Sequence, residues 1–198
     1  ANEVMCSVYS PAKSTPNLCY TYDFLTKIYP PSETDDRVDA WFDENIYSTL
    51  DGAPKEILKF ENPDIYNDGG ALTANAGNQV VFRLADAILL YAEALADLGT
   101  NDGKACELLN RIRTRAGAST LSLSGDDLKD AIYWERVREL MGEGHYFYDL
   151  VRTGKVCDNN YCYHPITRSE FREGAWTWPI SKTAQENNTL ITLNNYWE

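Results

Sequence analysis

The sequence predicts a mainly α-helical fold: a helical hairpin packed against further helices, with long irregular loops. Three observations support this class. Apolar residues recur at spacings of three and four over residues 81–98 and again over 105–116, and a third helical pattern covers 127–141, where a charged, half-apolar segment over 135–152 begins. Residues 1–79 differ, because six prolines interrupt them and exclude long helices there. We therefore expect a loop-rich segment over 1–79 and a helical region over 80–198, within one domain.

Shorter elements are expected on either side of these helices. Residues 2–9 and 17–24 are rich in Tyr, Val and Leu, which favours short strands or extended arms. Residues 35–45 are predicted to form one helix with an apolar face. That face consists of Val38, Trp41 and Phe42. Residues 153–198 are expected to be rich in loops, with 178–181 extended.

The clearest predicted helix covers residues 81–98. Its expected inward face consists of Val81, Leu84, Ile88, Tyr91, Leu95 and Leu98. Three alanines lie beside this stripe and permit the close approach of a second helix: Ala85, Ala92 and Ala96. Gly99 is expected to end the helix, since glycine tolerates the left-handed conformation that many helices adopt at their C-terminus.

A second helix is predicted to follow at once, capped by Thr100, Asn101 or Asp102. Its apolar face consists of Ala105, Leu108, Leu109, Ile112 and Ala116. Gly117 closes the helix, and so short a connection requires the two helices to be antiparallel. The pair, over residues 82–116, resembles a tetratricopeptide unit in its length and its small residues. One such hairpin must pack on another element to bury its apolar stripe.

A third helix is predicted over residues 127–141. Its inward residues are Leu128, Ala131, Ile132, Val137 and Leu140. Two pairs of opposite charge stand three residues apart and are expected to form ion pairs on the helix: Glu135 with Arg138, and Arg136 with Glu139. Gly142 and Gly144 are expected to break the helix before a short helical segment over 145–152.

The composition argues against two classes of function. The chain has 198 residues, of which 30 are acidic and 18 basic, with a formal net charge of −12 and a mean hydropathy of −0.45. Nucleic-acid binding is disfavoured, because phosphate contacts need clustered Lys and Arg. A transmembrane helix is disfavoured, because it needs a run of about 18 apolar residues. The acidic balance instead suits a neutral ligand.

The five cysteines leave the redox chemistry open. Cys106 lies on the apolar side of the second predicted helix and is expected to be buried and inert. Cys157 could bridge Cys162 across a short loop, and Cys6 could pair with Cys19, but sequence alone does not fix the connectivity. Zinc is less favoured, since the spacing is not C-x-x-C.

Two carboxylates raise the question of catalysis. Glu139 and Glu143 stand four residues apart and share a helix face, as the paired carboxylates of a glycosidase would require. Arg136, Arg138 and Arg152 are close enough in sequence to pair with them. We therefore favour a structural ion-pair network and expect no enzymatic activity.

Metal binding has weak support. His145 is expected to be a hydrogen-bonded structural imidazole, because a metal site needs several converging ligands. Residues 62–70 offer several oxygen ligands followed by glycines, so calcium is an alternative there. An ordinary turn rich in Asn and Asp is favoured, because the spacing is not that of an EF-hand. We expect no cofactor.

The charged segment also carries a family resemblance. Residues 135–152 read E-R-x-x-E-L-x-x-E-G-x-x-F-x-D-L-x-R, which resembles the signature of the SusD/RagB family in residue type and spacing. Residues 82–94 and 109–117 resemble two further family helices, R-x-A-[DE]-x-x-L-x-Y-A-E-A and L-N-x-[IV]-R-x-R-A-G. Residues 178–181 and 193–196 resemble the family segments x-P-I-P and Q-N-P-G-Y, with serine for the second proline and with the Pro-Gly pair missing.

The resemblance implies a SusD-like α fold, of which this chain matches the C-terminal portion of a larger protein. It also implies a lipoprotein of the bacterial outer-membrane surface, whose lipid anchor would lie in a portion not seen here. Such proteins bind glycans for polysaccharide utilisation and deliver oligosaccharides to a SusC-like TonB-dependent transporter. The alternative is a tetratricopeptide-like protein–protein scaffold with no sugar site in this chain.

Candidate sugar-binding residues follow from the chemistry of the ligand. The apolar faces of pyranose rings stack on Trp and Tyr, which also present a polar group to water. The candidates are Trp41, Tyr47, Tyr66, Asn67, Tyr161, Tyr163 and Trp176. Tyr66 is favoured among them, because Asn62, Asp64 and Asn67 lie beside it and could satisfy sugar hydroxyls. The resemblance itself assigns none of these residues.

Overall fold

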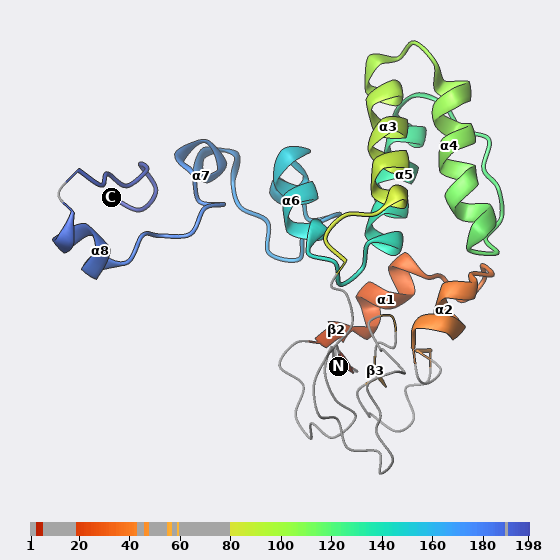
Figure 1. Ribbon diagram of the computed structural model, residues 1–198, viewed down its shortest axis with the longest axis horizontal. Coiled ribbons are helices and arrows are strands. Elements are labelled where there is room, and N and C mark those ends of the chain that lie inside the picture. The colour runs from red at the N-terminus through yellow and green to blue at the C-terminus, as the bar shows by residue number, and fades with distance from the viewer. Residues whose placement is uncertain are drawn as a thin grey trace. The chain divides into compact units, whose positions relative to one another are not determined.

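A computed structural model of the chain shows two compact units, Ala1–Glu143 and Gly144–Glu198 (Figure 1). The structure describes residues 3–5, 19–42, 46–47, 55–56, 59, 80–188 and 190–198. Residues 3–5, 19, 21 and 55–56 are described by their backbone alone. Helices dominate the described residues, which confirms the predicted mainly α class.

The first unit begins with a small three-stranded sheet. Strand β1 (Glu3–Met5) pairs antiparallel with β2 (Cys19–Thr21) and parallel with β3 (Lys55–Glu56), so the order is β2-β1-β3. The first two strands confirm the short extended elements expected there. Helix α1 (Tyr22–Ile28) follows β2 without a break and was not predicted from the sequence.

Helix α2 (Asp36–Trp41) is shorter than the helix predicted over 35–45, and its buried side chain is not apolar. The Asp35 carboxylate caps it by accepting a hydrogen bond from the Arg37 backbone N–H at 3.1 Å. Arg37 is buried, whereas Trp41 is half-buried. The predicted apolar face is confirmed only at Phe42, which is buried at the C-cap, because the side chain that the helix itself buries is a cation.

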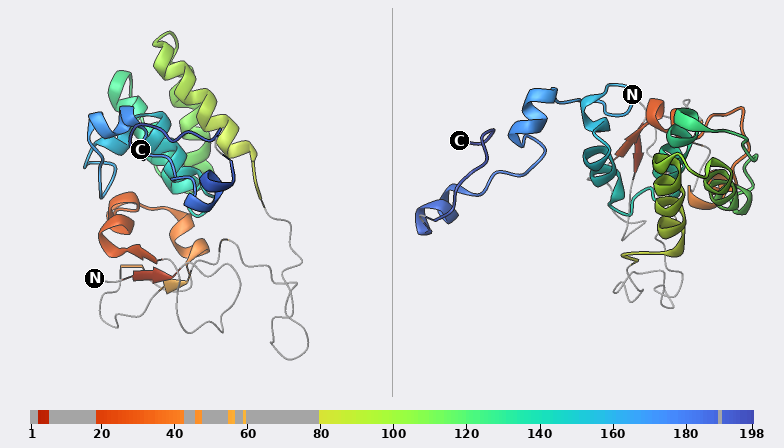
Figure 2. Two further views of the ribbon diagram at one scale, coloured as in Figure 1. Left: turned by 90° about the vertical axis from the view of Figure 1, so that its left-hand side faces the viewer. Right: turned by 90° about the horizontal axis from the view of Figure 1, so that it is seen from above.

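Three longer helices form a bundle: α3 (Leu84–Leu98), α4 (Asp102–Arg115) and α5 (Gly125–Glu139). Gly99 ends α3 with a φ angle of 62°, and the Asn101 side chain caps α4 by accepting from the Lys104 N–H at 3.1 Å. The two helices are therefore antiparallel, and α5 packs on both, as predicted (Figures 1 and 2). Helices α1 and α2 lie beyond one end of this bundle in both figures.

The inward face of α3 differs from the predicted one. The buried positions are Ala85, Asp86, Ile88, Leu89, Ala92 and Ala96, whereas Leu95 is partly buried. Leu84, Tyr91 and Leu98 were predicted to face inward but are 67%, 54% and 70% exposed. The error arose because α3 carries apolar residues almost all round, so their spacing does not indicate which stripe is buried.

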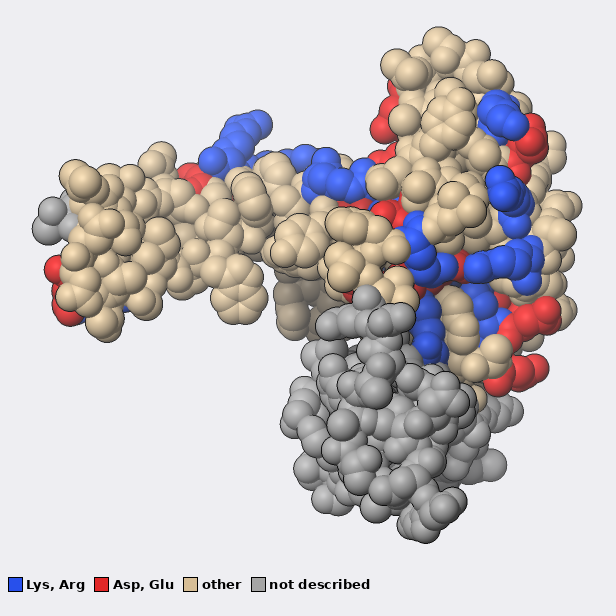
Figure 3. Space-filling view, viewed as in Figure 1, with Lys and Arg blue, Asp and Glu red and all other residues tan. Residues whose placement is uncertain are grey.

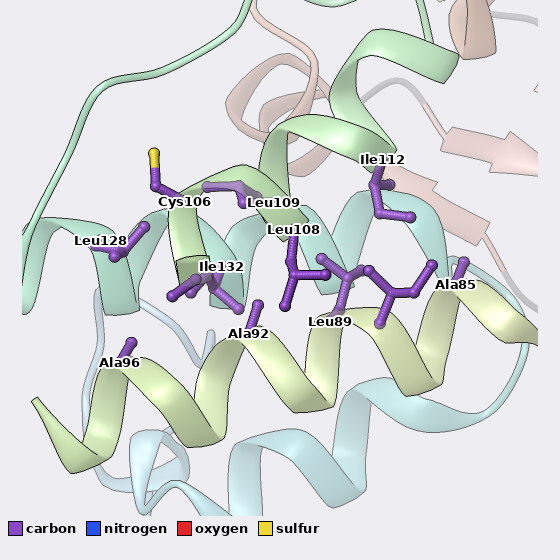
Figure 4. Packing of buried hydrophobic residues seen from close by; sticks show 12 residues of the cluster. Ala85, Leu89, Ala92, Ala96, Cys106, Leu108, Leu109, Ile112, Leu128 and Ile132 are labelled. Atoms are coloured by element: carbon purple, nitrogen blue, oxygen red, sulfur yellow. The ribbon is translucent and has the colours of Figure 1, made fainter. Parts of the chain in front are cut away.

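Small side chains determine how closely the helices of the bundle pack. The alanines of α3 face the larger side chains of α4 and α5, including Leu108, Leu109 and Ile132 (Figure 4). The predicted apolar faces of α4 and α5 are confirmed, since Leu109, Leu128 and Ile132 are completely buried. An alanine seam of this kind allows close interhelical packing with few voids.

The second unit consists of short elements. They are α6 (His145–Arg152), the 3₁₀-helix η3 (Lys155–Cys157), α7 (Arg168–Glu173) and α8 (Lys182–Asn187). Gly142 and Gly144 have φ angles of 76° and 84°, which confirms the predicted break before α6. The last three helical elements lie in the region expected to be rich in loops, and residues 178–181, which were predicted to be extended, have no regular secondary structure.

The described thiols are not bridged. Cys106 is buried, as predicted, and its Sγ donates to the Leu121 carbonyl at 3.2 Å. Cys157 and Cys162 are both free, so the bridge considered for this pair is absent from the structure. Cys6 lies outside the described residues. Within the described part of the chain, every helix is too short or too polar to cross a membrane.

Candidate functional site

Three carboxylates form a column along one face of α5 and the turn that follows it. Glu135, Glu139 and Glu143 are spaced by four residues, which brings successive side chains to the same side of a helix. Glu135 and Glu139 are fully buried, and the side chain of Glu143 is 3% exposed. A buried carboxylate is strongly destabilised without a partner of opposite charge, so this column requires cations around it.

Glu139 is the centre of the column. Its Oε2 accepts a hydrogen bond from Arg37 Nη1 at 3.0 Å, and its Oε1 accepts from Arg83 and Arg115. Its main-chain carbonyl accepts from Lys59 Nζ at 2.8 Å and from Arg83. The three arginines come from α2, from the segment before α3 and from α4, so the Glu139 carboxylate joins three parts of the unit to α5. Lys59 adds a fourth part through the main-chain carbonyl.

Glu135 and Glu143 extend the network in both directions. Glu135 pairs with Arg37 at 2.8 Å, and with Arg113 and Arg138 at 3.0 Å each. Glu143 pairs with Lys59 at 2.6 Å and with Arg83 at 2.8 Å. Arg37 contacts both Glu135 and Glu139, and Arg83 contacts both Glu139 and Glu143. The three carboxylates therefore act as one connected network.

The surrounding cations keep all three carboxylates ionised. Burial opposes ionisation, but the charges of Arg138, Arg37 and Arg113 outweigh it and hold the pKa of Glu135 below its usual range. The pKa values of Glu139 and Glu143 are lowered against the same penalty by hydrogen bonds from Arg83, with Arg115 and Lys59 adding to the effect. Burial lowers the pKa of Lys59 to about 8, although its hydrogen bond to Glu143 acts in the opposite direction.

This arrangement is suited to stabilising the fold rather than to acid–base catalysis. Glycoside hydrolysis needs one carboxyl group with a raised pKa to protonate the leaving group. The pKa values of Glu135, Glu139 and Glu143 are all lowered, and arginine or lysine groups occupy their oxygens. The favoured structural interpretation of Glu139 and Glu143 therefore has direct geometric support.

The partners of the column differ from the predicted ones. The pair of Glu135 with Arg138 is confirmed at 3.0 Å. Arg136 instead contacts Asp86 of α3 at 2.8 Å, and Arg152 contacts Asp149 at 2.7 Å. The partners of Glu139 lie 24 to 102 residues away in the chain, so no local spacing could have identified them. On the face of the first unit seen in Figure 3, basic and acidic side chains lie interleaved.

Two sugar-binding candidates are described in the first unit, Tyr47 and Trp41. Tyr47 is half-buried, and Trp41 lies beside two cations. The Trp41 ring lies 5.9 Å from the Arg37 guanidinium carbon and 4.1 Å from Lys59 Nζ, measured to the ring centroid. Two cations of the buried network therefore contact an aromatic ring that was predicted to bind a sugar. Tyr66 and Asn67 lie outside the described residues.

Tyr161 and Tyr163 lie in one loop of the second unit. Lys155 Nζ lies 3.5 Å above the Tyr161 ring, and the main-chain carbonyl of Tyr161 accepts a hydrogen bond from the Tyr146 hydroxyl at 2.7 Å. Burial raises the pKa of Tyr146 to about 12, so this hydroxyl stays protonated and continues to donate. Tyr163 is 90% exposed, with an edge contact to His164.

Trp176 lies in a separate turn after α7. It is 40% exposed, and its ring centroid lies 6.4 Å from that of Phe171. Trp178, which was not among the candidates, is 87% exposed. The sequence could have indicated the exposure of Trp178, because this residue directly precedes Pro179. In such an irregular segment a large ring has little regular structure to pack on.

Among the described residues, no three His, Cys, Asp or Glu side chains are arranged to hold a metal ion. Residues 62–70, where a calcium site was the alternative to a turn, lie outside the described part. The chemistry available in the described residues is therefore that of exposed aromatic rings and of neutralised ion pairs.

Known proteins resemble this chain over most of its length. A family model described as SusD family matches residues 55–197. SusD-like protein P25 of Formosa agariphila is 40% identical over 107 residues, which are 52% of this chain and 20% of that protein. SusD-like protein P38 of the same organism is 42% identical over 92 residues, which are 41% of this chain and 18% of that protein.

Solved structures give a similar result. A crystal structure of a SusD homolog from Bacteroides thetaiotaomicron is 59% identical, with a TM-score of 0.86, over 100% of this chain and 42% of that one. A SusD-like carbohydrate binding protein from Bacteroides vulgatus is 30% identical, with a TM-score of 0.47, over 61% of this chain and 25% of that one. The chain thus spans less than half the length of each of these proteins.

Proposed function

The chain belongs to the SusD family, and from this membership we propose that it is part of a protein that binds neutral oligosaccharides at the bacterial outer-membrane surface. In this proposal the protein is anchored by lipid and passes its ligand to a SusC-like TonB-dependent transporter. The net charge of −12 favours neutral over anionic glycans, because like charges repel. The carboxylates of Glu135, Glu139 and Glu143 take part as structural groups, and no bond is cleaved.

The observation that carries a sugar site within this chain is the exposure of aromatic rings from short ordered segments of the second unit. Trp176 supports the proposal best. Part of its indole packs near Phe171, and the remainder is accessible to a ligand. A partly supported ring loses little conformational freedom when a ligand stacks on it, which favours binding. Tyr161 and Tyr163 are the next candidates, whereas Trp41 already contacts two cations.

Titration with neutral oligosaccharides tests this proposal. Maltoheptaose, cellohexaose, a host-type N-glycan and a mucin-type O-glycan are added to the chain, and binding is followed by calorimetry. We expect saturable binding of at least one of them. Trp176→Ala should weaken that binding about tenfold, as removal of a central aromatic contact commonly does. Tyr148→Ala removes a 71% exposed ring outside the candidate set and should leave the affinity unchanged.

One observation favours the second candidate function, a protein–protein scaffold. Helix α3 presents Leu84, Tyr91 and Leu98 on its outer side, each more than half exposed and seven residues from the next. Aligned apolar residues at the surface commonly mark contact with another protein. If none of the four oligosaccharides binds while the chain shows a cooperative thermal melt, a sugar site in this chain is excluded and the scaffold function is favoured.

A further inference from the structure

The turn that carries Trp176 is bounded by a glycine with a left-handed backbone. Gly174 ends α7 with a φ angle of 97°, and its N–H donates to the Glu170 carbonyl at 3.0 Å. The Thr177 N–H donates to the Gly174 carbonyl at 3.0 Å, which closes residues 174–177 into a tight turn. A Cβ at position 174 would collide with the Asn194 side chain, so the C-terminal segment lies directly against this turn.

Asn194 joins the two ends of the turn through its carboxamide. Its Nδ2 donates to the Gly174 carbonyl at 3.1 Å and to Thr177 Oγ1 at 2.7 Å. Thr177 Oγ1 donates in turn to the Gly174 carbonyl at 2.7 Å and accepts from Trp197 Nε1 at 3.1 Å. The threonine hydroxyl thus uses its one donor and both of its acceptor positions.

A backbone hydrogen bond also holds the C-terminal segment against the end of α7. The Tyr196 N–H donates to the Glu173 carbonyl at 3.1 Å, at the C-terminus of α7. The helix itself is held at its start by a capping box between Thr167 and Glu170. The turn around Trp176 is therefore held between a capped helix and the C-terminal segment, although both lie at the surface.

We propose that Asn194 is a positioning residue for Trp176: its carboxamide holds turn 174–177 in the conformation that presents the indole to a ligand. That the ligand is a sugar rests on the proposed function. The role of Asn194 in holding the turn does not depend on it. A preorganised ring binds more tightly than the same ring on a mobile turn, because less freedom is lost on binding.

The first test does not need a sugar. Indole N–H signals are recorded by NMR on protein labelled with ¹⁵N-tryptophan and assigned with single Trp→Phe variants. In Asn194→Ala and Asn194→Asp, the Trp197 and Trp176 signals should shift or broaden, while the tryptophans of the first unit stay in place and show that it is folded. Asn195→Ala changes the neighbouring, exposed asparagine and should leave every signal unmoved.

Variants of Thr177 supply an independent test of the same network. Thr177→Val removes the hydroxyl and should reproduce the Asn194→Ala spectrum, whereas Thr177→Ser keeps the hydroxyl and should resemble the wild type. If the Trp176 signal remains unchanged in both Asn194→Ala and Thr177→Val, the network does not hold the turn, and the proposal is overturned.

A double-mutant cycle then tests the link to the sugar, with the tightest of the four oligosaccharides as probe. Asn194→Ala should weaken binding by no more than Trp176→Ala does, and should cause no further loss in the Trp176→Ala background. A full further loss in that background would show that Asn194 does not act through Trp176. If no oligosaccharide binds the wild type, the proposed function fails, while the NMR spectra still decide the restraint on the turn.

Discussion

Glu139 shows how a single buried side chain can join segments that are distant in the sequence. Its carboxylate receives guanidinium groups from Arg37, Arg83 and Arg115, and its carbonyl receives Lys59. Burying a carboxylate and several cations is costly, and only short, well-aligned hydrogen bonds offset that cost. Loss of Glu139 would remove the carboxylate that Arg37, Arg83 and Arg115 share, and so would leave these cations with less counter-charge.

We predict that Glu139→Gln lowers the free energy of unfolding by about 3 kcal/mol, because it leaves buried guanidinium groups facing a neutral amide. Urea denaturation followed by circular dichroism at pH 7 measures the loss. Glu107→Gln makes the same chemical change at a surface pair with Lys104 and should alter stability by less than about 0.5 kcal/mol. Equal effects of the two substitutions would contradict the central role of Glu139.

Helix α3 illustrates, at the scale of the element, an ambiguity that periodicity does not resolve. Ala85, Ala92 and Ala96 share the buried stripe, while Leu84, Tyr91 and Leu98 share an exposed one. The larger apolar residues were predicted to face inward because they recur at spacings of three and four along the helix. The structure buries Ile88 of the predicted set, but Leu89 and the three alanines form the rest of the inward face. Small residues there let the axes of α3 and α4 approach and let side chains of α4 and α5 fill the seam (Figure 4).

A matched pair of substitutions tests this assignment. Ala92→Leu adds volume to a completely buried position and should lower the free energy of unfolding by about 1–3 kcal/mol through overpacking. Ala94→Leu makes the same change two residues away on the exposed side and should be nearly neutral. Thermal melts of both variants provide the measurement. Destabilisation by Ala94→Leu alone would restore the face predicted from the sequence.

At the scale of the whole molecule, charged contacts connect helices of the first unit to α5, in addition to the apolar core that α3, α4 and α5 share. Arg37 links α2 to α5, Arg113 links α4 to α5, and the pair of Asp86 with Arg136 links α3 to α5. Helix α5 is thus the common partner of the described helices in the first unit, through its apolar residues on one side and its carboxylates on another. Such a design depends on the ionisation of its glutamates.

The dependence of stability on pH follows from the lowered pKa values of Glu135, Glu139 and Glu143. The unfolded chain takes up protons near the ordinary value of 4.5, at a pH where the folded glutamates are still ionised. Their stabilisation is therefore complete above about pH 5 and is lost as the pH falls through the lowered folded values. We expect the melting temperature to drop steeply below about pH 4.

Thermal melts followed by circular dichroism between pH 7 and pH 3 would show this drop in melting temperature, the acid limb of the stability profile. Glu139→Gln should flatten part of it, because one of the three titrating groups is then absent. A melting temperature that stays constant or rises on acidification would show that the three carboxylates do not stabilise the folded state. Glu107→Gln again serves as the control, and its acid limb should match that of the wild type.

The sequence by itself determined the mainly α class, the hairpin, the third helix and the glycine break after it, because each depends on residues close together in the chain. The segment over 135–152 also indicated the family, which the comparisons confirm. Ion pairs between residues close together on one helix could be predicted for the same reason, and the predicted pair of Glu135 with Arg138 is correct.

Only the tertiary structure decided which stripe of α3 is buried, which cations surround Glu139, and how Asn194 closes the turn around Trp176. The contacts of Glu139 with its cations and of Asn194 with the turn join residues that lie between 17 and 102 positions apart in the chain. Sequence spacing describes one element at a time, whereas burial and charge pairing depend on what a second element places against it. That is the physical reason why the helices could be predicted and their partners could not.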